Sequence, residues 1–184
     1  MRYSTYLISC LALGDTTAHG ALRAQSPSVP PTVLVADMTF YGEKANSIQP
    51  GDSAMAQAAT TRLRSALRES GAFALADSGR ALDAMAGADL PGVQCNASVE
   101  CVRRVAQKVG ARWAVMGTVS KLSNLIWYLS GQLIDVGSGR IVLDDGFELK
   151  GPRDEMVPRG AASLARRVEK AAARETGDSR AERR

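Results

Sequence analysis

Histidine is almost missing from this sequence, since His19 is the only one among 184 residues. Cysteine and aromatic residues are also scarce, with three cysteines and 5% aromatic residues. A zinc site commonly needs about four ligands, mostly Cys or His, so a site of this kind is not expected. The sequence also lacks a glycine-rich phosphate loop and a His-Glu metal motif. We therefore expect no metal, no cofactor and no enzymatic activity.

Long hydrophobic runs are also lacking. The longest apolar stretch near the start, YLISCLALG from Tyr6 to Gly14, is too short to span a bilayer. Arg2 precedes this stretch and small residues follow it, which is the pattern of a secretory signal. We therefore expect a signal peptide over residues 1–24, a proline-rich linker over 25–31 and a periplasmic or secreted protein. Cys10 stands where lipoprotein signals place a cysteine, but only nine residues precede it, so its lipidation stays open.

Charge of one sign is in local excess only near the carboxyl terminus, where basic residues outnumber acidic ones. The formal net charge is +4, and arginine and lysine concentrate after Arg159. The simpler interpretation is a solvated helix face followed by a flexible basic tail over 175–184, and the alternative is an anionic partner. A nucleic-acid partner would rest on charge alone, so none is expected.

Apolar periodicity predicts one α/β domain over residues 32–174. A strand is expected at Thr32–Phe40, then an amphipathic helix that starts at Asp52 or Ser53 and stops at Gly71. The later elements are a short strand at 73–77, a short helix opened by Ser78, a helix capped by Asn96 or Ser98, strands at 113–123, 125–136 and 140–151, and a helix from about Asp154 to Arg174. The order predicts a mixed sheet with a carboxyl-terminal three-stranded antiparallel meander and with helices packed on the sheet.

Cys95 and Cys101 lie six residues apart in the middle of the chain. In an exported protein a disulfide is the simplest interpretation, and two free thiols or a metal site are the alternatives. Continuous helix would separate the two Cα atoms by roughly 9 Å, more than a disulfide tolerates. Cys95 is therefore expected to lie before the helix, with the chain turning at residues 96–98.

The segment CNASVECVRRVAQKVGARWAVMGTVSKLSNLIWYLSGQLIDVGSGRIV resembles a family of exported bacterial proteins catalogued as a domain of unknown function, of the 2380/3280 type. The residues that match the pattern of this family are Gly110, Ala111, Gly117, Val119, Lys121, Ser123, Asn124, Leu125, Asp135, Val136 and Gly139. The sequence departs from the pattern at LKGPRDEMVPRG, where an Asn and a Trp are expected. More distantly, the order of elements is similar to the amino-terminal domain of TolB and to CsgG proteins, which implies an envelope protein.

Two hypotheses about function follow. In the first, the protein is a non-catalytic binding or assembly module that presents a sheet edge or face to another envelope protein. In the second, it binds a small ligand, or is an envelope enzyme, through Lys121, Ser123 and Asn124. Convergence of these three side chains in a pocket favours the second hypothesis. Hydrogen bonds from Ser123 and Asn124 to the backbone of a turn favour the first.

Overall fold

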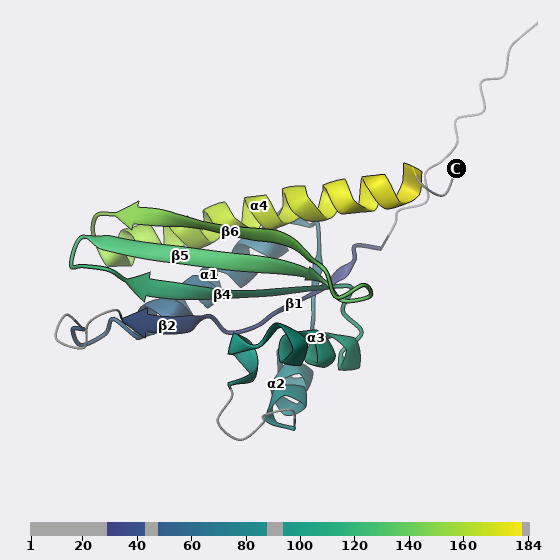
Figure 1. Ribbon diagram of the computed structural model, residues 1–184, viewed down its shortest axis with the longest axis horizontal. Coiled ribbons are helices and arrows are strands. Elements are labelled where there is room, and N and C mark those ends of the chain that lie inside the picture. Colours follow the sequence, from purple (N-terminus) through teal and green to yellow (C-terminus); the bar gives the residue numbers. More distant parts are fainter. Residues whose placement is uncertain (1–28, 43–47, 88–93, 182–184) are drawn as a thin grey trace, which may run out of the picture.

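The computed structural model describes residues 29–42, 48–87 and 94–181, with side chains described up to residue 177 (Figure 1). The predicted signal peptide, with His19 and Cys10, and most of the predicted linker lie outside the described residues and stay predictions. The elements are β1 (Thr32–Val35), β2 (Thr39–Gly42), α1 (Ala54–Ser70), β3 (Ala74–Leu75), α2 (Ser78–Ala86), the 3-10 turn η2 (Cys95–Ala97), α3 (Val99–Lys108), β4 (Trp113–Lys121), β5 (Ile126–Asp135), β6 (Ile141–Lys150) and α4 (Arg153–Ala181).

The strands form one mixed sheet in the order β3-β1-β4-β5-β6, with β2 also paired to β4. β1 runs parallel to β3 and β4, and β2 runs parallel to β4. β4, β5 and β6 form an antiparallel meander joined by short turns. The predicted fold class is confirmed.

The strand predicted at Thr32–Phe40 is wrong in one respect, because it is two strands. Val35 pairs with Val115, and Thr39 pairs with Thr118. Three residues lie between the paired positions in the first segment but only two in β4, so the first segment carries one extra residue. An extra residue of this kind bends a strand and interrupts its ladder. The backbone N–H of Met38 turns away from β4 and donates to the Thr60 hydroxyl of α1 at 2.9 Å.

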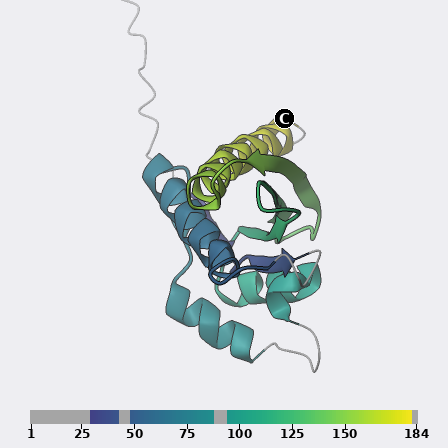
Figure 2. The ribbon, with the colours of Figure 1, turned by 90° about the vertical axis from the view of Figure 1, so that its left-hand side faces the viewer.

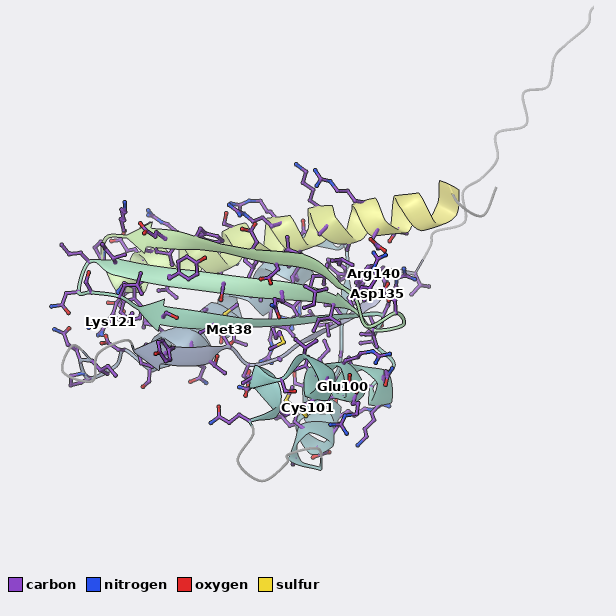
Figure 3. The ribbon with its side chains drawn as sticks, in the orientation of Figure 1. Met38, Glu100, Cys101, Lys121, Asp135 and Arg140 are labelled. Atoms are coloured by element: carbon purple, nitrogen blue, oxygen red, sulfur yellow. A yellow bond between two sulfur atoms is a disulfide. The ribbon has the colours of Figure 1, made fainter. Side chains whose placement is uncertain are left out.

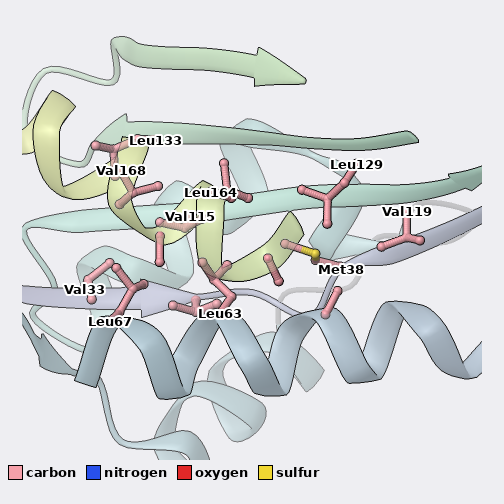
Figure 4. Close-up of a cluster of buried hydrophobic side chains, with 14 of the residues drawn as sticks. Val33, Met38, Leu63, Leu67, Val115, Val119, Leu129, Leu133, Leu164 and Val168 are labelled. Carbon is pink, nitrogen blue, oxygen red and sulfur yellow. The ribbon is translucent and has the colours of Figure 1, made fainter. Parts of the chain in front are cut away.

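Two apolar clusters lie on opposite faces of the sheet. Seen end-on, α1 and α4 lie on one side and α2 and α3 on the other (Figure 2). In the larger cluster, Leu63 and Leu67 of α1 and Leu164 and Val168 of α4 are fully buried against the strands (Figure 4). Gly131 lets α4 approach closely, because a Cβ there would lie 2.5 Å from Leu164. The smaller cluster joins α2 and α3 to Leu34, Ala36, Ala114, Ile134 and Val136.

The predicted helix ends are mostly confirmed. Gly71 ends α1 with φ 69°, in the left-handed region that favours glycine. Asp77 caps α2 by accepting from the N–H of Arg80, so Ser78 is the first helical residue rather than the cap.

Helix α4 runs on to Ala181, beyond its predicted end at Arg174 and into the segment that the sequence assigned to the tail. Glu175, the first residue beyond the predicted end, pairs with Arg140 at 2.6 Å, and the Thr176 hydroxyl donates to the carbonyl of Ala172 within the helix.

Candidate functional site

Lys121, the first candidate binding residue, points into the protein at the end of β4 (Figure 3). Its side chain is 1% exposed, and its Nζ lies 2.6 Å from Oδ2 of Asp52, which is 0% exposed. The same carboxylate accepts from the backbone N–H of Gln49 at 2.7 Å and pairs with Arg153 through its other oxygen. The ammonium also lies 5.8 Å from the centre of the Trp127 ring. This cluster ties together β4, the residues just before α1 and the start of α4.

The hydrogen bonds of this cluster determine the charge of Asp52. Burial by itself raises the pKa of the carboxyl, because the charged form loses its hydration. The Gln49 N–H, the Lys121 ammonium and the Arg153 guanidinium favour the charged form and together lower the pKa below its ordinary value. The aspartate is therefore an anion between two cationic partners.

Ser123 and Asn124 follow in the turn between β4 and β5. The Ser123 hydroxyl accepts from the backbone N–H groups of Leu125 at 3.3 Å and Ile126 at 3.1 Å. Asn124 is exposed. The structure thus does not bring Lys121, Ser123 and Asn124 together in one pocket, and their part in binding stays a prediction.

Cys95 and Cys101 are joined by a disulfide, with their Cα atoms 5.2 Å apart. Cys95 begins η2, and Cys101 lies in the first turn of α3, as the spacing argument requires. Ser98 caps α3 by accepting from the N–H of Cys101 at 3.4 Å. Both cysteines are nearly fully buried in the smaller apolar cluster, so the bond holds η2 against α3 and the sheet. Among the described residues, no group of His, Cys, Asp or Glu could hold a metal ion.

Strand β6 forms one edge of the sheet, on the side of α4 (Figure 1). Of the strands that the structure describes, β5 alone pairs with it. The N–H of Gly151 donates to the carbonyl of Leu125 beside β5, and backbone groups alternate in direction along a strand. The N–H and C=O groups of Asp144, Gly146, Glu148 and Lys150 therefore point to the free edge. The Gly146 N–H donates a hydrogen bond to the carboxylate of Asp145 at 2.8 Å instead.

A groove of about 390 Å³ lies between the start of β6 and the second half of α4. Arg167 of α4 pairs with Asp145 and lies 4.7 Å from the centre of the Phe147 ring. The groove is lined by Val142, Leu143, Asp145, Arg167, Lys170, Ala171, Arg174 and Glu175. Sequence reasoning missed this site. The signal that could have found it is the run of charged residues within an apolar strand, which is typical of an edge.

The second face of the sheet is only partly covered by helices. Beyond the smaller cluster, the face carries the hydroxyl side chains of Thr118, Ser120 and Ser130, and Tyr41 of β2 is 59% exposed. Tyr128 lies so close to the backbone of Gly146 that no Cβ fits there. This part of the sheet is therefore a polar surface with one exposed aromatic residue, Tyr41, and the half-buried Tyr128.

A mixed sheet with one edge on β6, packed against helices on both faces and holding the buried Asp52–Lys121 pair, defines a small α+β domain. The chain belongs to the family described as "Protein of unknown function (DUF2380)", whose model matches residues 31–168. The predicted family resemblance is confirmed.

Solved structures with TM-scores above 0.5 share the fold at low sequence identity. The LpoB C-terminal domain from Salmonella enterica is 21% identical, over 70% of this chain and 89% of that chain, with a TM-score of 0.52. Lipoprotein GNA1162 from Neisseria meningitidis is 12% identical, over 76% and 96%, with a TM-score of 0.51. TolB from Acinetobacter baumannii is 14% identical, over 81% of this chain and 30% of that chain, with a TM-score of 0.49. No curated protein matches the sequence.

Proposed function

We propose that this protein is a non-catalytic, protein-binding or assembly module of the cell envelope, periplasmic or secreted, whose partner is another envelope protein. The observation that carries the proposal is the free edge of β6, where backbone donors and acceptors lie beside a groove. Unpaired strand edges can accept a strand from another chain, and soluble proteins normally protect long ones. The shared fold with a lipoprotein and the signal-like start of the sequence support an envelope location. None of the described helices is long and apolar enough to cross a membrane.

A small-ligand-binding role is the second candidate, and one crevice favours it. The crevice, of about 630 Å³, lies at the carboxyl end of β1, where the sheet continues to β3 on one side and β4 on the other. Ligands of open α/β sheets commonly bind at such positions. Its polar groups already bond each other, since Arg64 pairs with Asp37 at 3.0 Å and the Asn96 amide donates to the carbonyl of Asp37. We therefore rank this role below protein binding.

Site-specific photocrosslinking in intact cells tests the proposal. A photoreactive residue replaces Glu148, on the β6 edge, and in a control replaces Arg68, on the exposed side of α1. We expect one protein of the envelope to crosslink at position 148 and not at position 68. Crosslinking that is equal at both positions, or absent at position 148, would contradict a binding role for this edge.

The export step has a separate test. Mass spectrometry of the envelope fraction should find a mature amino terminus near residues 21–25. An intact Met1 recovered from the cytoplasm would contradict the proposed location.

A further inference from the structure

Building on the proposed function, we infer that the groove between β6 and α4 binds an extended, acidic segment of the partner protein, which adds to the sheet as a strand beside β6. The extended conformation of the segment follows from the backbone of β6, and its negative charge follows from the side chains of α4.

The edge of β6 is long enough to order a peptide. β6 has 10 residues, and the outward backbone groups of Asp144, Glu148 and Lys150 have no hydrogen-bond partner among the described residues. Leu133 of β5 pairs with Leu143, and the next residue, Ile134, pairs with Ile141. Val142 is therefore an extra residue in β6, and it ends the regular edge at the groove. A strand that pairs along 144–150 therefore continues directly into the groove.

The cations of α4 determine the charge of the segment. Lys170 and Arg174 are exposed and lie four residues apart, on one side of the helix, where both line the groove. No carboxylate of the described side chains pairs with either of them, whereas Arg167 is already paired with Asp145. Two cations that no described carboxylate pairs with, next to an unpaired strand edge, attract carboxylate side chains.

The groove also has a place for apolar side chains. Val142 and Ala171 are half-buried and line it between the charged residues. Because side chains alternate along a strand, a bound segment places every second side chain toward α4. The segment that fits therefore combines acidic residues with small apolar ones.

Synthetic peptides test the inference directly. The probe is a labelled ten-residue peptide of alternating valine and glutamate, and its matched control has lysine in place of glutamate. We expect fluorescence anisotropy with the purified full chain to show binding of the glutamate peptide, weakened by salt, and at least tenfold weaker binding of the lysine peptide. Equal binding of the two peptides would overturn the assigned charge.

Protein variants locate the binding. The double variant Lys170→Glu, Arg174→Glu should lose about tenfold in affinity for the glutamate peptide. The double variant Arg104→Glu, Lys108→Glu makes the same change of net charge with two exposed cations of α3, on the other face of the sheet, and should change the affinity less than twofold. Equal losses in the two variants would show a nonspecific charge effect and overturn the assigned site.

Backbone methylation tests the strand pairing without altering the protein. Peptides N-methylated at odd positions only and at even positions only should differ at least tenfold in affinity, because only one set of N–H groups faces β6. The variant Asp144→Pro should also weaken binding, whereas Asp144→Ala, which loses the same contact with Gln132, should not. Equal affinities of the two methylated series would overturn strand addition.

The outcomes separate this inference from the proposed function. If position 148 crosslinks to one envelope protein while the peptides fail these tests, protein binding stands and the acidic strand is wrong. If sedimentation shows instead that two copies of this chain pair through β6 and that the glutamate peptide does not dissociate them, the occupant of the edge is a second copy and the inference is wrong.

Discussion

Asp52 and Lys121 are buried together, although burial removes the hydration of both charges. Removal of one partner leaves the other charge in the interior. We expect Asp52→Asn and Lys121→Met each to lower the free energy of unfolding by about 3–5 kcal/mol. The double variant Asp52→Asn, Lys121→Met should lose less than the sum of the two single variants, as measured by urea denaturation.

A surface pair provides the control for this prediction. Arg62 and Glu69 lie 3.2 Å apart on α1 with both side chains exposed. Removal of either should change stability by about 1 kcal/mol or less. A similarly small effect of Lys121→Met on stability would show that the buried pair is not structural. It would then support the hypothesis that Lys121 binds a ligand.

The lowered pKa of Asp52 predicts a pH dependence of stability. The carboxyl has a lower pKa in the folded protein than in the unfolded chain, where it is about 3.9. Its contribution to stability is therefore fully present above the unfolded pKa and is lost as the pH falls through the folded pKa. The difference in unfolding free energy between the native chain and Asp52→Asn should shrink below about pH 4. A difference that stays constant from pH 7 to pH 2 would contradict the lowered pKa.

Residue roles could be predicted only where neighbours in the chain decide them. The turn function of Ser123 follows from its own segment, and both its bonding partners lie within three residues. The partner of Lys121 lies 69 residues away, so no local pattern could show that this lysine turns inward.

At the scale of the elements, the disulfide links η2 to α3 over a short loop. We expect the variant Cys95→Ser, Cys101→Ser to fold with a melting temperature lowered by several degrees, because a loop this short contributes on the order of 2 kcal/mol. Circular dichroism with temperature gives the measurement, and peptide binding at the β6 groove should be retained. Peptide mapping under non-reducing conditions that finds both thiols free in protein from the envelope would contradict a structural disulfide.

Most elements could be predicted because their signals are local. The apolar spacing of α1, the glycine that ends it and the alternation along β4 and β5 all lie within one segment each. The break between β1 and β2 has no such signal, because it depends on the register against β4 and on the Thr60 hydroxyl that takes the Met38 N–H. The last turns of α4 also depend on distant contacts, such as that of Glu175 with Arg140.

At the scale of the whole molecule, the fold class was predictable from the order of the elements, whereas the site was not. Three consecutive strands with short turns indicate an antiparallel meander in any fold. Whether β6 lies at an edge depends on which strand β1 pairs with. Because β1 pairs with β4 and not with β6, β6 is left at the edge, and this pairing is a property of the complete sheet. The groove beside β6 therefore depends on how α4 packs in three dimensions, which the sequence does not show.

The central place of β1 controls the order in which the chain can fold. β1 is the first strand of the sequence, yet it lies between β3 and β4, and its register with β4 joins Val33 to Trp113. Contacts this distant in sequence form late, whereas the β4–β5–β6 meander is local and can form early. A chain that emerges amino terminus first therefore cannot complete its sheet until β4 has been synthesised. We expect Leu129→Ala in β5 to slow refolding and Val33→Ala in β1 mainly to speed unfolding in stopped-flow experiments, and the reverse pattern would show that β1 docks first.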